Sequence, residues 1–265
     1  MHPFINTTTV NKKEFQMIHR PEIPQTLEEW QEMFGKIYGE KNRKRSKESI
    51  LLRVVEEASE LAEALREDNI SMSQMKLTVD DLKKRKSAQK VLEWELPDIL
   101  AWLCSFCDSV DHRLQEDVWH KYPGVCPYCL EKYHCTCTVT PYNMRKPKQL
   151  IDKELDHYRK TGKMITTLDG WTRRYAELYG RINRLFPVEY SGFHALEEIG
   201  EVSDDLRKMT ERASDFTHDA LKGEIADVFS WTVAIALRVG LDLSQIVWQK
   251  FPSVCPYCGD APCTC

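Results

Sequence analysis

The sequence predicts an all-α fold made of two tandem helical bundles, each with a small four-cysteine motif. The 265-residue chain has only 11 glycines and 12 prolines, and this low content of turn formers favours helices over many short strands. Apolar residues recur at three- and four-residue steps in several segments, which is the spacing of one helix face. The chain also repeats itself, because VWHKYPGVCPYC at 118–129 returns as VWQKFPSVCPYC at 247–258.

The composition is that of a folded protein. Hydrophobic residues make up 42% and charged residues 29% of the chain, which excludes a disordered polypeptide. No segment approaches the roughly 18–20 apolar residues of a transmembrane helix, and the first residues lack the basic-then-apolar pattern of a secretory signal. We therefore expect a soluble, cytoplasmic protein. Its net charge of −4 does not favour a nucleic-acid partner.

The repeated landmarks define the expected domains. EEASE at 56–60 returns as EEIGE at 197–201, an offset of 141, whereas ELPD at 95–98 returns as EIAD at 224–227, an offset of 129. The first copy therefore carries 12 extra residues, which we assign to a connection at the charged stretch 78–90. This pattern indicates a tandem duplication. The expected order is an N-terminal arm at 1–23, a first module at 24–137, a linker at 138–165 and a second module at 166–265.

Each module is expected to contain three or four helices. The segments 48–67 and 224–240 have apolar residues at helical spacing, and Gly240 is a candidate helix cap. Within the linker, 150–160 is a candidate short helix. Four large or soft side chains are expected in the core, with stacking on a base as the alternative for the tryptophans: Trp30, Trp171, Cys104 and Cys107.

Acidic side chains at helical spacing occur in both copies. Glu57 and Glu60 lie three positions apart, as do Glu95 and Asp98, so each pair projects from one side of its helix. If the two helices pack antiparallel, the four carboxylates converge, and their mutual repulsion requires a cation. Hard oxygen ligands suit Mg²⁺ or Mn²⁺. The alternative is a solvated helix face, but the whole set returns in the second copy as Glu198, Glu201, Glu224 and Asp227.

These motifs resemble those of the MazG-like, all-α nucleoside triphosphate pyrophosphohydrolases. The family signature is EExxE, a variable spacer and then ExxD before an apolar helix, and both copies contain it. The resemblance implies a helical bundle that works as a dimer and a Mg²⁺-dependent hydrolysis of a nucleoside triphosphate to a monophosphate and pyrophosphate. It implies that Glu56 and Glu197 either orient the attacking water or support the metal ligands from behind. It also implies eight metal ligands, namely Glu57, Glu60, Glu95, Asp98, Glu198, Glu201, Glu224 and Asp227.

Two further features bear on how each copy would work. Lys121 and Lys250, at matched positions, are candidate ligands of the substrate phosphates, with exposed lysines at a helix end as the alternative. Pro97 is expected to bend the helix of Glu95 and Asp98, so the second site is expected to be better formed. A nucleotide sensor with one degenerate catalytic half is the corresponding alternative. Two copies in one chain would form an internal pseudo-dimer, with a further homodimer left open.

Eight of the ten cysteines form a duplicated pattern. Each module ends with CxxC followed by CxC after four or five residues, a spacing typical of a structural zinc site. CPYC is also the dithiol of glutaredoxin-like proteins, but no βαβ pattern surrounds it, and disulfides would need an oxidising compartment. The expected Zn²⁺ ligands are Cys126, Cys129, Cys135 and Cys137, and then Cys255, Cys258, Cys263 and Cys265.

A second class of function stays open at this stage. Zinc knuckles often bind RNA or single-stranded DNA, and the basic runs at 41–45 and 83–86 offer contacts to phosphate. Neither run has a counterpart in the second copy and the second run lies in the insert, so a solvated surface explains them better. The alternative to the hydrolase is thus a module that binds nucleic acid or protein through its knuckles.

Overall fold

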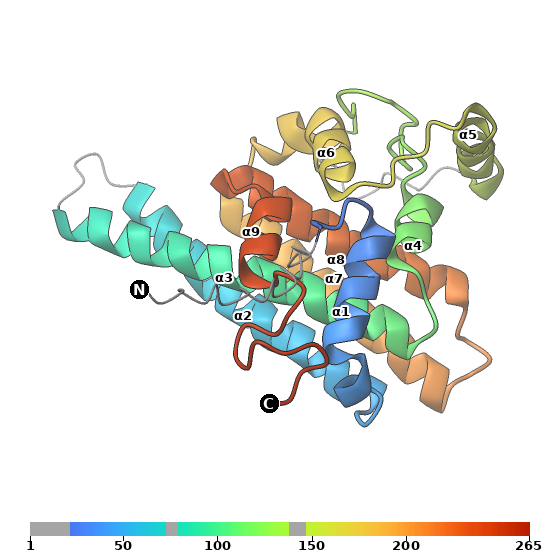
Figure 1. Cartoon of the computed structure of the whole chain (residues 1–265). Helices are drawn as coiled ribbons and strands as arrows, with labels where there is room; N and C mark the ends of the chain where they lie inside the picture. The colour runs from blue at the N-terminus through green and yellow to red at the C-terminus, as the bar shows by residue number, and fades with distance from the viewer. Residues whose placement is uncertain (1–21, 73–78, 138–146) are drawn as a thin grey trace, which may run out of the picture.

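The computed structural model describes residues 22–72, 79–137 and 147–265, and these residues form α-helices joined by short loops (Figure 1). No β-strand occurs among them, which confirms the predicted all-α fold. The helices are α1 (Leu27–Asn42), α2 (Lys47–Met72), α3 (Val79–Ser109), α4 (Leu114–Lys121), α5 (Lys148–Thr161), α6 (Leu168–Asn183), α7 (Val188–Glu211), α8 (His218–Val239) and α9 (Leu243–Lys250).

Two sets of four helices follow one another in the same order, α1–α4 and α6–α9. The helices α1 and α6 both have 16 residues and both begin after a threonine whose side chain accepts a hydrogen bond from the first turn. These threonines, Thr26 and Thr167, pair in an isolated antiparallel bridge. The amide of Leu27 donates to the carbonyl of Thr166 at 2.8 Å. The two sets therefore meet where their first helices begin.

One hydrophobic core joins the two sets. Helix α2 packs against α3, α7 packs against α8, and α2 also packs against α7. The side chains of Trp30 and Trp171 are fully buried, as are those of Phe34 and Phe229 in the two sets. Burial of each such side chain contributes about 1.5–3 kcal/mol to folding. The tryptophans are thus core residues, as expected, and do not face a ligand.

The extra residues of the first set lengthen helices, so their assignment to a connection is wrong. Helix α3 has 31 residues and already begins at Val79, whereas α8 has 22 residues. The stretch 79–90 consists largely of lysine, leucine, alanine and glutamine, which are good helix formers, and it contains neither glycine nor proline. In Figure 1 the adjoining ends of α2 and α3 project beyond the other helices.

Pro97, which is expected to bend its helix, lies inside α3, and the helix continues through this residue. Proline lacks an amide hydrogen, so one hydrogen bond of the helix is missing there. The packing of α3 against α2 and α1 on the core side holds the helix together across this position. Glu95 and Asp98 consequently lie on one continuous helix.

The helix expected in the linker is present as α5 and is docked onto the first set. The ring of Tyr158 lies 5.4 Å from that of Trp119 on α4. Beneath it lies Gly124, with a φ of +72°, and a Cβ there would come within 2.6 Å of the Tyr158 ring. Only glycine combines this backbone conformation with so close an approach. Helix α5 ends at Gly162, which has the left-handed conformation of a helix cap.

Three other expectations concern burial, membranes and the chain start. Cys104 and Cys107 are buried in the apolar part of α3, as predicted. In the part of the chain that the structure describes, no helix combines the length and apolarity needed to cross a bilayer. The expected N-terminal arm at 1–23 lies almost wholly outside the described residues.

Candidate functional site

Carboxylates converge at two places in the molecule. Helices α2 and α3 bring together Glu57, Glu95 and Asp98, because the i, i+3 spacing puts the last two on one face of α3. Helices α7 and α8 bring together the corresponding residues Glu198, Glu224 and Asp227. Within each group, one oxygen from each side chain lies within 4.8 Å of the others. We call these groups the first and the second carboxylate cluster.

Both clusters hold carboxyl groups whose acidity is strongly perturbed. Burial, together with the negative charge of Asp98, raises the pKa of Glu57 to about 8. In the second cluster, burial and the charge of Asp227 raise the pKa of Glu198 to about 8, and burial is the main reason that the pKa of Glu224 rises to about 7. Desolvated carboxylates this close together are stabilised by a divalent cation between them, and their oxygens are suitable ligands for Mg²⁺ or Mn²⁺.

Two of the eight predicted metal ligands lie at the edge of these clusters. Glu60 and Glu201 are exposed and are not part of the three-carboxylate groups. They are still close enough for their charges to contribute to the raised pKa values of Glu57 and Glu198. The structure thus brings together three predicted ligands in each half and leaves the fourth beside them.

The two residues predicted to orient water lie farther out. Glu56 is half exposed and forms an ion pair with Arg53. Glu197 is 61% exposed and its Oε2 lies 3.0 Å from Nδ1 of His194. Neither belongs to a group of converging oxygens, but Glu56 lines the first cavity whereas Glu197 does not line the second, so their role stays a prediction.

The two predicted phosphate-binding lysines are buried, and each lies in the cluster of the other helix set. Lys121, at the end of α4, forms an ion pair with Asp227 and lies 3.7 Å from Oε2 of Glu224. Lys250, at the end of α9, forms an ion pair with Asp98 and donates to the carbonyl of Trp94 at 2.8 Å. With exposed fractions of 7% and 4%, neither lysine is the solvent-exposed residue that was the alternative.

The surroundings of the two lysines differ. Burial acts to lower the pKa of Lys121, but the charges of Asp227 and Glu224 outweigh it and the pKa lies above its ordinary value. For Lys250, burial prevails over the attraction of Asp98 and the pKa lies below its ordinary value. Both lysines supply positive charge that partly neutralises the carboxylates.

Sequence reasoning missed one residue of the second cluster. Tyr122 is buried, and its hydroxyl donates a hydrogen bond to Oδ1 of Asp227. Its counterpart in the repeat is Phe251, which has no hydroxyl. A position that is tyrosine in one copy and phenylalanine in the other looks apolar, so the sequence did not indicate that the Tyr122 hydroxyl contacts Asp227.

A cavity adjoins each cluster. The cavity at the first cluster has a volume of about 350 Å³, and that at the second has about 310 Å³. These volumes lie at the lower end of the range of small-molecule sites. Glu57 and Asp98 line the first cavity, and Glu198 and Asp227 line the second. Each cluster therefore has an adjacent space for a ligand.

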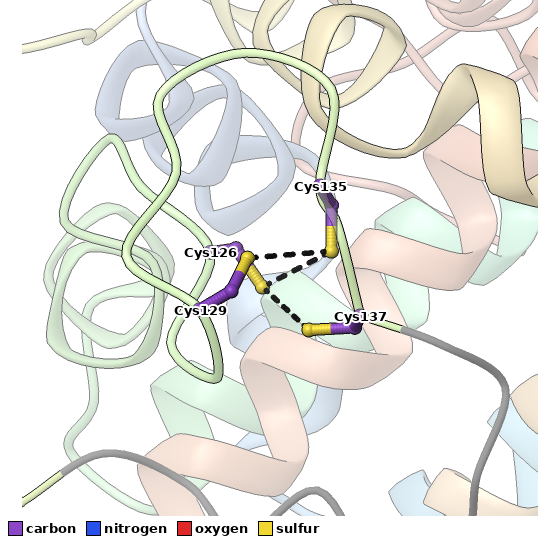
Figure 2. A group of neighbouring side chains, drawn as sticks. All are labelled: Cys126, Cys129, Cys135 and Cys137. Carbon is purple, nitrogen blue, oxygen red and sulfur yellow. Dashed lines mark hydrogen bonds between the residues drawn. The ribbon is translucent and has the colours of Figure 1, made fainter.

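The eight patterned cysteines form two compact groups of thiols. In the first, the sulfur of Cys126 lies 3.4 Å from that of Cys135 and 3.7 Å from that of Cys137, and Cys129 and Cys135 are 3.7 Å apart. Figure 2 shows the four sulfurs directed toward one another. A tetrahedral zinc ion with Zn–S bonds of about 2.3 Å holds its sulfurs about 3.8 Å apart. The donor set therefore fits zinc.

The second group of thiols has the same arrangement. The sulfurs of Cys255 and Cys265 are 3.8 Å apart, and those of Cys258 and Cys263 are 3.9 Å apart. Hydrogen bonds outweigh the opposing effect of burial and lower the pKa of Cys126, through Cys135, to about 5, and that of Cys258, through the backbone of Asp260 and Thr264, to about 6. A low pKa favours the thiolate, which is the form that binds a metal.

The alternatives for the cysteines find no support in the structure. All ten cysteines are free thiols. A glutaredoxin-like dithiol requires a βαβ unit, and no strand is present in residues 22–72, 79–137 and 147–265. His134, near the first group, is exposed and lies outside the four metal-binding sulfurs.

Each cysteine group docks onto the first helix of the other set. The amide of Cys135 donates to the carbonyl of Leu178 on α6 at 2.8 Å. The amide of Cys263 donates to the carbonyl of Ile37 on α1 at 2.7 Å, and Ile37 and Leu178 are themselves 141 residues apart. Cysteines of the first group line the cavity of the second cluster, and those of the second group line the cavity of the first. Each helix set therefore supplies both a lysine and a cysteine group to the carboxylate cluster of the other set.

Comparison with protein families gives one match. Residues 45–130 match the MazG nucleotide pyrophosphohydrolase domain. Neither the curated proteins nor the solved structures contain a match to the chain. The matched residues include α2, α3 and α4, and with them Glu57, Glu95 and Asp98. The first carboxylate cluster therefore lies in a region that is similar to a nucleotide pyrophosphohydrolase domain.

Proposed function

We propose that the protein is a Mg²⁺- or Mn²⁺-dependent nucleoside triphosphate pyrophosphohydrolase. It cleaves the bond between the α- and β-phosphates and releases a nucleoside monophosphate and pyrophosphate. The observation that carries this proposal is the convergence of three carboxylates at each of two sites, one of them within the matched residues 45–130. Phosphoryl transfer requires mainly positioned cations beside a cavity for the substrate, and both sites combine carboxylates that could hold such cations with an adjacent cavity.

The side chains of the clusters have distinct proposed roles. Glu57, Glu95 and Asp98 hold the metal in the first half, with Glu60 at its edge, and Glu198, Glu224, Asp227 and Glu201 do so in the second. The bound metal would neutralise phosphate charge and lower the pKa of the attacking water. Glu56 and Glu197 would orient this water from the edge of the site.

The buried lysines complete the proposed sites. Without a metal, Lys121 and Lys250 partly neutralise the carboxylates with which they pair. Once a divalent cation takes over this role, the ammonium groups are available to bind the substrate's phosphates. Because each lysine comes from the other helix set, each site depends on both halves of the chain.

The organisation of the chain is part of the proposal. The modules at 24–137 and 166–265 arose by duplication and form an internal pseudo-dimer in the cytoplasm, and the exchanged lysines and cysteine groups support this arrangement. Each group of four cysteines holds a structural Zn²⁺ that fixes the fold of a segment too short to have a core of its own. Whether two chains associate further is open to measurement of the molar mass in solution.

No specific observation favours the nucleic-acid alternative. Both cysteine groups dock onto helices and line the cavities. In the basic run 83–86, only Lys86 has a described side chain.

The test is a measurement of products from a panel of ribo- and deoxyribonucleoside triphosphates with Mg²⁺. We expect equal amounts of monophosphate and pyrophosphate, with no orthophosphate. Changing Glu57→Gln together with Glu198→Gln is expected to abolish turnover without loss of zinc. A folded, zinc-loaded protein that hydrolyses no nucleotide would contradict the proposal.

A further inference from the structure

The two cavities are built from corresponding positions of the chain. The offset of 141 relates Tyr38 to Tyr179 and Asn42 to Asn183, and the offset of 129 relates Trp102 to Trp231. All of these residues line their cavities. The two sites therefore share a framework, and differences between them reflect individual side chains rather than a different architecture.

Three cationic side chains line the first cavity. At the corresponding positions the second cavity has two apolar side chains and a histidine. Lys41, Arg45 and Arg53 line the first cavity. The residues 141 positions later, which line the second cavity, are Ile182, Phe186 and His194. One cavity is therefore cationic at the three positions where the other is apolar or aromatic.

The tryptophan shared by the two cavities has different neighbours in each. The guanidinium groups of Arg45 and Arg53 lie 5.3 Å and 5.6 Å from the centre of the Trp102 ring. Cation–π contacts thus hold both arginines in the cavity, and Arg53 also pairs with Glu56. In the second cavity His194 stacks on Trp231 with 4.5 Å between ring centres and 12° between planes.

The second cavity gains a further aromatic surface. The rings of Phe186 and Tyr190 stack at 5.4 Å, and Tyr190 corresponds to Ser49 of the first copy. Planar aromatic side chains bind a flat ring by stacking and need no charge on it. Arginine side chains, in contrast, bind phosphate through paired N–H groups.

We propose that the two sites select different ligands. The first cavity binds a second phosphate group of its ligand through Arg45, Arg53 and Lys41. The second cavity binds the nucleobase of an ordinary nucleoside triphosphate between aromatic rings. The inference rests on the proposed function and adds the substrate class of each site: a nucleotide with an additional phosphate for the first, and a simple nucleotide for the second.

Binding to one site at a time tests this. The double change Glu198→Gln and Glu224→Gln disables the second site, so that only the first can bind. The double change Glu57→Gln and Glu95→Gln disables the first site, so that only the second can bind. The probes are the Mg²⁺ complexes of α,β-methylene adenosine triphosphate, of the same compound with a 3′-phosphate, and of inorganic triphosphate, measured by calorimetry. We expect the 3′-phosphate to tighten binding at least tenfold at the first site and to give no gain at the second. Inorganic triphosphate, which has no base, should lose at least tenfold in affinity only at the second site.

Exchange of the distinguishing residues is the decisive step. Lys41→Ile, Arg45→Phe and Arg53→His together should abolish the gain from the 3′-phosphate, and Phe186→Arg with His194→Arg should create it at the second site. The single change Arg53→His, at a partly exposed position, provides the same test with less risk to the fold. The inference would be overturned if these substitutions left the ligand preference of each site unchanged. It would also be overturned if the 3′-phosphate tightened binding equally at both sites of the unchanged protein.

The outcome is separable from that for the proposed function because binding is measured without turnover. A protein that hydrolyses no nucleotide but changes its ligand preference with these exchanges contradicts the hydrolase and supports the inference. A protein that hydrolyses nucleotides but keeps its preference contradicts the inference alone.

Discussion

The two carboxylate clusters agree in their charged groups and differ in what surrounds them. Both combine three carboxylates with a buried lysine from the other half. At the first cluster the Lys250 ammonium lies 3.9 Å from the centre of the Trp94 ring, whereas at the second Tyr122 hydrogen-bonds to Asp227. The carboxylates and the lysine are thus the same at both clusters while their neighbours differ, as expected if both sites act on phosphates but on different molecules.

The largest effect that would sharpen this comparison is expected at the cysteine groups. Cys126→Ser should abolish hydrolysis at the second site and spare the first, because the first cysteine group docks on α6 and lines the second cavity. Cys255→Ser is the matched control and should have the opposite effect. Product formation in proteins with a single intact cluster measures both. If each change instead abolished hydrolysis at the cluster in its own half of the chain, the cysteine groups would not dock onto the opposite half in solution.

The next largest effect is expected at the buried lysines. Lys121→Met removes one partner of a buried ion pair with Asp227, a change that costs about 3–5 kcal/mol when the remaining charge is left alone. Mg²⁺ should restore more stability to this variant than to the unchanged protein, since it supplies the missing positive charge. Denaturant unfolding with and without Mg²⁺ checks this.

Lys250→Met is the control for the lysine exchange. It should destabilise the first cluster in the same way, because Lys250 pairs with Asp98. Each change should lower turnover only at the cluster that the lysine contacts. A loss at the cluster in the lysine's own half would break the comparison.

A smaller effect is expected from Tyr122→Phe, which gives the second site the residue found at Phe251. The change removes one hydrogen bond to the Asp227 carboxylate. It should lower the free energy of unfolding by about 1.5–3 kcal/mol, which is typical of a hydrogen bond to a charged group. Mn²⁺ affinity of the second cluster, followed by titration, should change while that of the first does not. Equal changes at both clusters would contradict a local role.

The smallest effect is a dependence of stability on pH, because both groups concerned are partly open to solvent. The pKa values of Glu57 and Glu198 are raised to about 8 in the metal-free fold, so the stability present below about pH 4.5 is lost as the pH rises through 8. Mg²⁺ should reduce this loss of stability because it binds the ionised carboxylates of Glu57 and Glu198. Denaturant unfolding in Mg²⁺-free buffer at pH 6 and pH 8 measures it, and a metal-free protein that is more stable at pH 8 would contradict it.

Local spacing predicted much of the site. The three-residue steps in Glu95–Asp98 and Glu224–Asp227 require a shared helix face, and a repeated set of four indicated that the two helices meet. The start of α3 was harder to place, because a charged stretch at 79–90 is equally typical of a loop and of an exposed helix. Helix propensity of its lysine and alanine residues decided in favour of the helix.

The exchange between halves could not be predicted. A short segment such as 122–137 leads from α4 to either half, and no local pattern specifies which helix it will contact. The hydrogen bonds to Leu178 and Ile37 are made by backbone atoms, which leave no trace in the sequence. The replacement of Arg45 by Phe186 was visible in the repeat, but its meaning depends on the cavity that both residues line.

The most direct test of the central claim is a titration of the metal-free carboxylates with Mn²⁺, followed by electron paramagnetic resonance. Glu57→Gln with Glu95→Gln should remove the Mn²⁺ bound by the first cluster, Glu198→Gln with Glu224→Gln that bound by the second, and the combination all of it, with zinc content unchanged. Mn²⁺ binding by the combined variant that equals that of the unchanged protein would contradict the account.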